Sequence, residues 1–145
     1  MAKIEVSGFD GVEEMFRDMA KIPDEVKIAA LNAMAEPAES AVRRSGLAMG
    51  VRDPDSRVHI LDKITHTRPK VDETGGFTRV TFSGKRNRGS TATRNAEIAF
   101  INEYGKTNQP ARPFIQQAAE TAADQIAEPG EKIIGKWFES AAGGK

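Results

Sequence analysis

Four potential metal ligands recur at helical spacing in the middle of the chain. They are Asp55, His59, Asp62 and His66, so one face of a helix would carry all four. Imidazole and carboxylate groups are ordinary ligands of a catalytic zinc ion. A small metal-dependent hydrolase that uses Asp55, His59 and Asp62 is therefore one hypothesis. However, the segment 65–67 has strand character, and two solvated histidines beside aspartates account for the same residues, so we expect no metal site.

Other enzyme motifs are incomplete. Gly84-Lys85 is followed by Arg86, whereas a phosphate-binding loop needs Ser or Thr after its lysine. The chain has only two histidines, and a serine with a lone histidine does not indicate nucleophilic catalysis. Glu103 follows an apolar run, but a structural turn explains it better, with Tyr104 covering a sheet edge and Gly105 at positive φ. We expect no enzymatic activity and no cofactor.

A basic loop occupies residues 85–94. It contains Lys85, Arg86, Arg88 and Arg94 and no acidic residue. In a single copy it would make only a weak, salt-sensitive contact with phosphate groups, whereas copies around a ring would form a positive collar beside DNA. It contains no aromatic residue for base stacking. The loop is thus a candidate contact for DNA, bound non-specifically, or for another subunit, and a solvated hairpin tip is the alternative.

Composition favours a single domain spanning residues 1–145. Lys plus Arg and Asp plus Glu are both 21, but the basic residues are concentrated in the middle, where 65–94 holds 7 basic and 2 acidic residues. Cysteine is absent, which excludes disulfides and thiolate metal sites. No apolar run reaches the length of about 20 residues of a membrane helix. The N-terminus lacks the pattern of a signal peptide, so we expect synthesis in the cytoplasm and no membrane partner.

Residues 1–50 have mainly helical patterns after a short strand at 3–7. One helix is expected to end near Lys21. A second, long and rich in alanine, is expected from Pro23 to about Leu47, because proline and acidic residues suit a helix start. Pro37 lies inside this helix and predicts a kink.

Residues 56–104 have mainly strand patterns. A short helix at 56–64 precedes strands at 64–71 and 77–82, which are joined by a hairpin turn at 72–76, and a further strand is expected at 96–101. Residues 113–140 form a C-terminal helical segment, interrupted at Pro129-Gly130. These elements predict an α+β fold. A mostly antiparallel sheet of about three to five strands would be covered by the N-terminal helices, one of them long, and a C-terminal helix.

The joint between the last strand and the C-terminal helix contains the most specific pattern. Pro113 is expected at the first helical position, because its missing N–H group would be unpaired there. Phe114 would anchor the helix to the core. Arg112 is a cation near a helix N-terminus, which the helix dipole disfavours, so we expect an acidic partner, either Glu103 or a carboxylate of a neighbouring subunit.

Two segments of this joint resemble a known family. They are Phe100-Ile-Asn-Glu-Tyr-Gly-Lys-Thr107 and Pro110-Ala-Arg-Pro-Phe114. Their order and spacing resemble the tail-component family of long-tailed bacteriophages, whose members act in the neck as tail-completion or head–tail joining proteins. The chain departs from the family pattern at Lys106, which precedes Thr107, and by one extra residue after Phe100.

The resemblance implies a structural virion protein that is made in the bacterial host cytoplasm. It implies a ring, commonly of six subunits, at the head-proximal end of the tail, in contact with the tail terminator or tail tube and with head-closure or connector proteins. It also implies a structural joint and subunit contact, with no catalytic role, at Glu103, Tyr104, Gly105, Arg112, Pro113 and Phe114. A tail terminator of the same tail, or a nucleic-acid-binding accessory protein that uses residues 85–94, are the alternatives.

Overall fold

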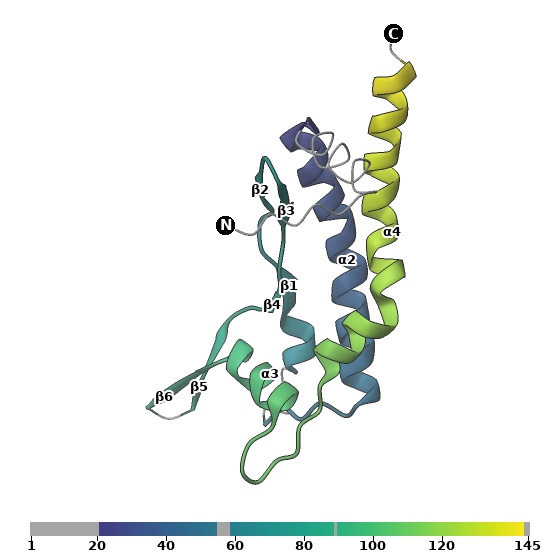
Figure 1. Cartoon of the computed structure of the whole chain (residues 1–145). Helices are drawn as coiled ribbons and strands as arrows, with labels where there is room; N and C mark the ends of the chain where they lie inside the picture. Colours follow the sequence, from purple (N-terminus) through teal and green to yellow (C-terminus); the bar gives the residue numbers. More distant parts are fainter. Residues whose placement is uncertain (1–20, 55–58, 89, 144–145) are drawn as a thin grey trace, which may run out of the picture.

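Two long antiparallel helices dominate the computed structural model, which describes residues 21–54, 59–88 and 90–143 (Figure 1). They are α2 (Asp24–Ala48) and α4 (Phe114–Gly143). The expected strand at 3–7 and the helix ending near Lys21 fall almost entirely outside the described residues. Within those residues, no helix combines the length and the apolar character needed to cross a membrane.

Small residues let α2 and α4 pack closely. The helix α2 matches the prediction and continues through Pro37. The predicted interruption at Pro129-Gly130 is wrong, because α4 runs through both residues. Gly130 is buried against α2, and a Cβ atom there would lie 2.6 Å from the sulfur of Met34. Packing against α2 therefore stabilises a helical turn that proline alone would disfavour.

Six short strands form three antiparallel pairs in the described residues. The strands are β1 (Ile64–His66) paired with β4 (Val80–Phe82), β2 (Lys70–Asp72) with β3 (Gly75–Phe77), and β5 (Lys85–Arg88) with β6 (Thr91–Arg94). A short 3-10 helix, η1 (Ile60–Lys63), precedes β1. The predicted α+β class is confirmed, but the strands form separate two-stranded ladders. The segment 85–94 is one of these hairpins and not an irregular loop.

The predicted turn at 72–76 joins β2 to β3. The carboxylate of Asp72 accepts hydrogen bonds from the hydroxyl and the backbone N–H of Thr74, at 2.7 and 2.8 Å. Bonding to the Thr74 hydroxyl is the main reason that the pKa of Asp72 lies below its ordinary value. The ammonium of Lys27, on α2, donates to the carbonyl oxygen of Asp72 at 2.6 Å and ties the hairpin to the long helix.

The strand predicted at 96–101 is wrong, because this segment lies in helix α3 (Asn95–Tyr104). The buried residues of α3 have the spacing of one helical face, and they are Asn95, Ile98, Ala99, Asn102 and Glu103. Three of these five are polar. Apolar residues alone therefore did not reveal the helical period.

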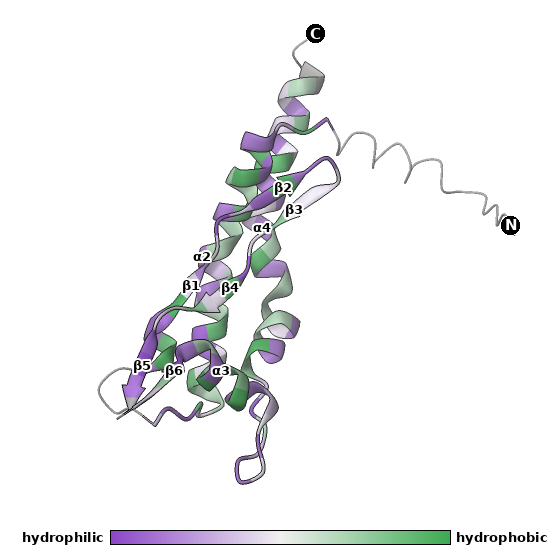
Figure 2. Ribbon diagram, turned by 90° about the vertical axis from the view of Figure 1, so that its left-hand side faces the viewer, coloured by the Kyte–Doolittle hydropathy of each residue, from purple (hydrophilic) through white to green (hydrophobic). Residues whose placement is uncertain are grey.

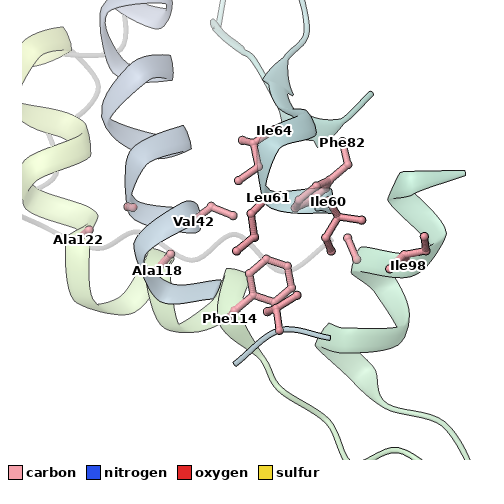
Figure 3. Close-up of a cluster of buried hydrophobic side chains, with 12 residues drawn as sticks. Val42, Ile60, Leu61, Ile64, Phe82, Ile98, Phe114, Ala118 and Ala122 are labelled. Carbon is pink, nitrogen blue, oxygen red and sulfur yellow. The ribbon is translucent and has the colours of Figure 1, made fainter. Parts of the chain in front are cut away.

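The main core lies where η1, β1 and β4 meet α3 and the adjoining ends of the two long helices (Figure 3). Phe114 and Ile60 are fully buried there. The ring of Phe114 packs edge-on against Phe82, with centroids 6.0 Å apart. The expected role of Phe114 as the anchor of the C-terminal helix is confirmed, although its partners come from a hairpin and from α3.

Candidate functional site

The joint from α3 to α4 begins with a glycine turn. Gly105 has φ of 78°, as predicted, and its N–H donates to the carbonyl of Ile101 at 2.7 Å. A Cβ atom on Gly105 would lie 2.8 Å from backbone atoms of both Gln109 and Ala111. Lys106 and Gln109 then pair through two backbone hydrogen bonds of 2.8 and 3.0 Å. Glycine is thus required by conformation and by space.

Glu103 caps the start of α4. Its two carboxylate oxygens accept the backbone N–H groups of Ile115 and Gln116, at 2.8 and 3.0 Å. The carbonyl of Pro113 accepts the N–H of Gln117, so Pro113 lies one position before its predicted place. Glu103 satisfies two N–H groups that lack helical partners and puts a negative charge at the positive end of the dipole.

One of the two expectations was that Arg112 would pair with Glu103. The structure shows no such ion pair. The backbone N–H of Arg112 donates to the carbonyl of Asn102 at 2.6 Å, and Arg112 is half-buried. One terminal nitrogen of its guanidinium is buried without a hydrogen-bond partner among the described residues. The Glu103 carboxylate is occupied by α4, which is the physical reason that the ion pair is missing. A carboxylate from a neighbouring subunit stays a prediction.

Asn102 connects the joint to the segment that follows α2, a role that sequence reasoning missed. Its side-chain oxygen accepts the N–H of Arg52 at 2.8 Å, and its amide nitrogen donates to the carbonyl of Arg52 at 2.7 Å. The same nitrogen donates to Ile98, and Gln109 donates to the oxygen. The side chain is 1% exposed, and all four of its hydrogen-bonding positions are used.

An exposed aromatic pair lies on the outer face of α3. Tyr104 is 69% exposed and Phe100 is 62% exposed, and their ring centroids are 4.6 Å apart. Tyr104 therefore does not cover a sheet edge, contrary to the prediction, because the segment is helical. Large aromatic groups in solvent mark interaction surfaces more often than isolated aliphatic ones. Of the motif residues, Tyr104 is the one best placed to contact a partner.

The basic residues 85–94 form an arm, here defined as β5, β6 and their turn. Lys85 lies opposite Arg94 in the register, and both are exposed. Arg86 instead forms a bidentate salt bridge with Asp53, with 2.7 Å between Nη2 and Oδ2. The Asp53 side chain is fully buried and that of Arg86 is 10% exposed. This bond fixes the arm to the body, and nothing in the local sequence pattern had singled out Asp53.

The proposed helical face of metal ligands does not form. Asp55 lies outside the described residues. His59 precedes η1, its Nδ1 accepts the N–H of Leu61 at 3.2 Å, and its Nε2 lies 3.3 Å from the carbonyl of Val51. His66 is in β1 and pairs with Glu39 at 2.6 Å. Among the described residues, no group of three His, Cys, Asp or Glu side chains could hold a metal ion.

An open cleft of about 610 Å³ lies beside the joint. Its polar lining includes Arg52, Asp53, His59, Asn102, Lys106 and Gln109. Asp53, His59 and Asn102 are already engaged in the hydrogen bonds given above. The described residues that line the cleft include no Ser, Thr or Cys. The cleft therefore lacks the hydroxyl or thiol of a nucleophile–base pair.

No family model, curated protein or solved structure matches this chain. Two features of the molecule itself bear on its function. One is the capped joint with its exposed Tyr104, and the other is the basic arm held by Asp53.

Proposed function

We propose that this protein is a structural component of the neck of a long-tailed bacteriophage. It assembles as a ring on the head-proximal end of the tail, completes the tail and joins it to the head. Its partners are further copies of itself, the tail terminator or tail tube protein, and the head-closure or connector proteins. Its place is the virion, after synthesis in the host cytoplasm, and its role is mechanical, without catalysis or a cofactor.

The observation that carries the proposal is the construction of the joint. Gly105 turns the chain, Glu103 caps α4 and Phe114 fills the core, so these motif residues hold two helices at a fixed angle. Tyr104 and Phe100 turn their large aromatic side chains to solvent side by side. A rigid corner that presents an aromatic pair suits a subunit that must meet others in one orientation.

Electron microscopy with native mass measurement tests this proposal. The purified protein, alone and mixed with tail tubes, is expected to form rings of one stoichiometry, with six subunits as the expectation from the family resemblance. Rings bound at one end of the tubes would support a role in the neck. A chain that stays monomeric at high concentration and in the presence of tubes would contradict it. Labelled protein in assembled tails would separate tail completion from tail termination by the neighbours that it contacts.

The basic arm supports a second candidate, a nucleic-acid-binding accessory protein. Lys85 and Arg94 are exposed on it, and the arm carries no acid. Fluorescence polarisation with random duplex DNA at low salt tests this function. Tight binding by the monomer, lost as salt rises, would favour it over the neck role.

A further inference from the structure

We propose that the arm of one copy binds the outer face of α4 on the next copy. The inference depends on the proposed ring, because it names the surfaces by which neighbouring subunits meet. The partner is therefore a second copy of this chain, and the contact is between cations of the arm and carboxylates of α4.

The arm has the properties of an element that is incomplete by itself. Lys85 lies directly opposite Arg94, and like charges in that arrangement destabilise a hairpin. Within the described residues neither side chain forms a salt bridge. The arm is also a lone two-stranded ladder, which is only marginally stable in water. An acidic partner surface would remove the repulsion and cover the hairpin.

The arm is nevertheless held in one direction before any partner binds. The buried salt bridge between Arg86 and Asp53 fixes β5 to the segment after α2. At the same end of the hairpin, the N–H of Asn95 donates to the carbonyl of Gly84 at 3.0 Å and closes the base. Preorganisation of this kind lowers the entropy that binding would otherwise cost.

The outer face of α4 offers the complementary charge. Ala118 and Ala122 are buried against the core, and Glu120, Asp124 and Glu131 lie on the opposite side of the same helix by its 3.6-residue period. All three carboxylates are exposed. The two lysines of α4 lie away from this row, and Lys132 is already paired with Glu128 at 3.0 Å.

The arm and the acidic row lie on opposite sides of the molecule. In Figure 1 the arm extends at the lower left, whereas α4 is the outermost element at the right. The quarter turn of Figure 2 also separates them, with the hydrophilic strand β5 at the lower left and α4 above it and to the right. The two surfaces of one chain therefore cannot meet. A contact between different patches of identical chains is head-to-tail, and it makes a closed ring when the rotation is right.

Charge favours this partner over DNA. The whole chain has equal numbers of basic and acidic residues, so no net field attracts a polyanion. Of the four cations in residues 85–94, Arg86 is committed to Asp53. Lys85 and Arg94, the exposed cations among the described side chains of the arm, match the carboxylates of the row on a neighbouring copy, whereas they would neutralise only a few phosphates.

A charge swap within the full chain tests the contact. The double variant K85E/R94E is expected to raise the dissociation constant of the oligomer at least tenfold, measured by sedimentation velocity, and D124K/E131K should do the same. A chain that carries all four changes restores the attraction and should recover assembly. The arm reversal keeps a like-charged pair at the same register, so the hairpin itself is perturbed little. K132E/K136E, on the same helix but away from the row, is the matched control.

A cross-link locates the contact independently of affinity. Because the chain contains no cysteine, R94C and D124C can be introduced one per chain and the two proteins mixed. Oxidation should then produce a covalent dimer of one copy of each variant, whereas R94C mixed with K136C, a position on the same helix away from the row, should not. Because each chain then carries a single cysteine, no intramolecular disulfide can form.

Each outcome decides the inference. Rings that persist with K85E/R94E and give no cross-link would overturn this contact and leave the proposed ring intact. Chains that remain monomeric under all conditions would overturn both. If K85E/R94E abolishes binding to duplex DNA but not the oligomer, the arm is a nucleic-acid surface and the inference is wrong. If each double variant loses assembly and the fourfold variant recovers it, the contact between the arm and α4 is supported.

Discussion

At the residue scale, Glu103 joins two helices through hydrogen bonds to backbone groups only. Glu103→Ala removes both acceptors from the N–H groups of Ile115 and Gln116 and the favourable charge at the dipole. We expect the free energy of unfolding to fall by about 1–2 kcal/mol, as for other helix caps. Urea denaturation followed by circular dichroism measures this. Asp124→Asn, an exposed acid on the same helix, should change stability by less than about 0.5 kcal/mol.

Asn102 also joins separate segments through hydrogen bonds to backbone groups, and replacing it should lower the free energy of unfolding by more than replacing Glu103. Asn102→Ala leaves the N–H and carbonyl of Arg52, which form part-buried hydrogen bonds, without the partners that they have now. Leaving a buried group unsatisfied costs about 1–3 kcal/mol, and these two are part-buried, so we expect the free energy of unfolding to fall by about 2–3 kcal/mol in total. Asn108→Ala, in the exposed turn nearby, is the control in the same denaturation experiment. Equal stability of the two variants would contradict this role of Asn102.

Sequence reasoning identified the residues of the joint but not the bonds between them. The positive φ of Gly105 and the burial of Phe114 followed from residue type and position. The partners of Glu103 could not follow, because they depend on where α4 starts relative to the end of α3. Asp53 was missed for a similar reason. A single carboxylate has no local pattern, and its partner Arg86 lies 33 residues further along the chain.

At the element scale, replacing a helix glycine by alanine should change stability in opposite directions at two positions. One glycine packs against η1, and the other has open space around it. Gly46→Ala places a Cβ atom 2.6 Å from a methyl group of the buried Leu61, and we expect a loss of about 1–2 kcal/mol from crowding. Gly135→Ala meets no atom within 4 Å and should stabilise α4 by about 0.5–1 kcal/mol. Thermal unfolding of both variants checks the signs, and a gain in stability for Gly46→Ala would refute tight packing at η1.

The attachment of the arm depends on the salt bridge between Asp53 and Arg86. Asp53→Ala leaves a nearly buried guanidinium without its carboxylate, and we expect a loss of about 3 kcal/mol. In the double variant Asp53→Ala/Arg86→Met, the free energy of unfolding should fall by less than the sum of the losses in the two single variants. A coupling energy of about 1.5–3 kcal/mol in this double-mutant cycle would confirm the pair. Hydrogen exchange should also accelerate in β5 and β6, and slow exchange there in Asp53→Ala would contradict the anchoring.

Elements with a regular apolar period were predicted well, and those whose buried face is polar were not. The alanine stripe of α2 gave nearly its observed limits, and the turn at 72–76 was recognised from its glycines. The helix α3 was mistaken for a strand because Asn95, Asn102 and Glu103 occupy its buried face. Pro129 predicts a break from its residue type, because the packing of Gly130 against Met34, which keeps the helix continuous, has no local sequence pattern.

At the scale of the whole molecule, the exposed aromatic pair separates assembly from folding. Phe100 and Tyr104 contact each other but are mostly in solvent, so truncating them should hardly affect the monomer. Mutual stacking of such rings is worth about 0.5–1.5 kcal/mol. The free energy of unfolding of the monomer should therefore fall by no more than this in the double variant Phe100→Ser/Tyr104→Ser.

The same pair should matter far more in the proposed ring. An aromatic anchor at the centre of an interface typically contributes about 2 kcal/mol or more, so the loss of even one anchor should raise the subunit dissociation constant about thirtyfold, which is the least we expect of the double variant. Sedimentation equilibrium measures this, with Leu47→Ser as control, because Leu47 is 68% exposed but belongs to α2. Since α3 follows the arm directly in the chain, a neighbour bound to the arm would pass close to this helix. An unchanged dissociation constant would place the subunit interface away from α3 and leave the aromatic pair to one of the other proposed partners.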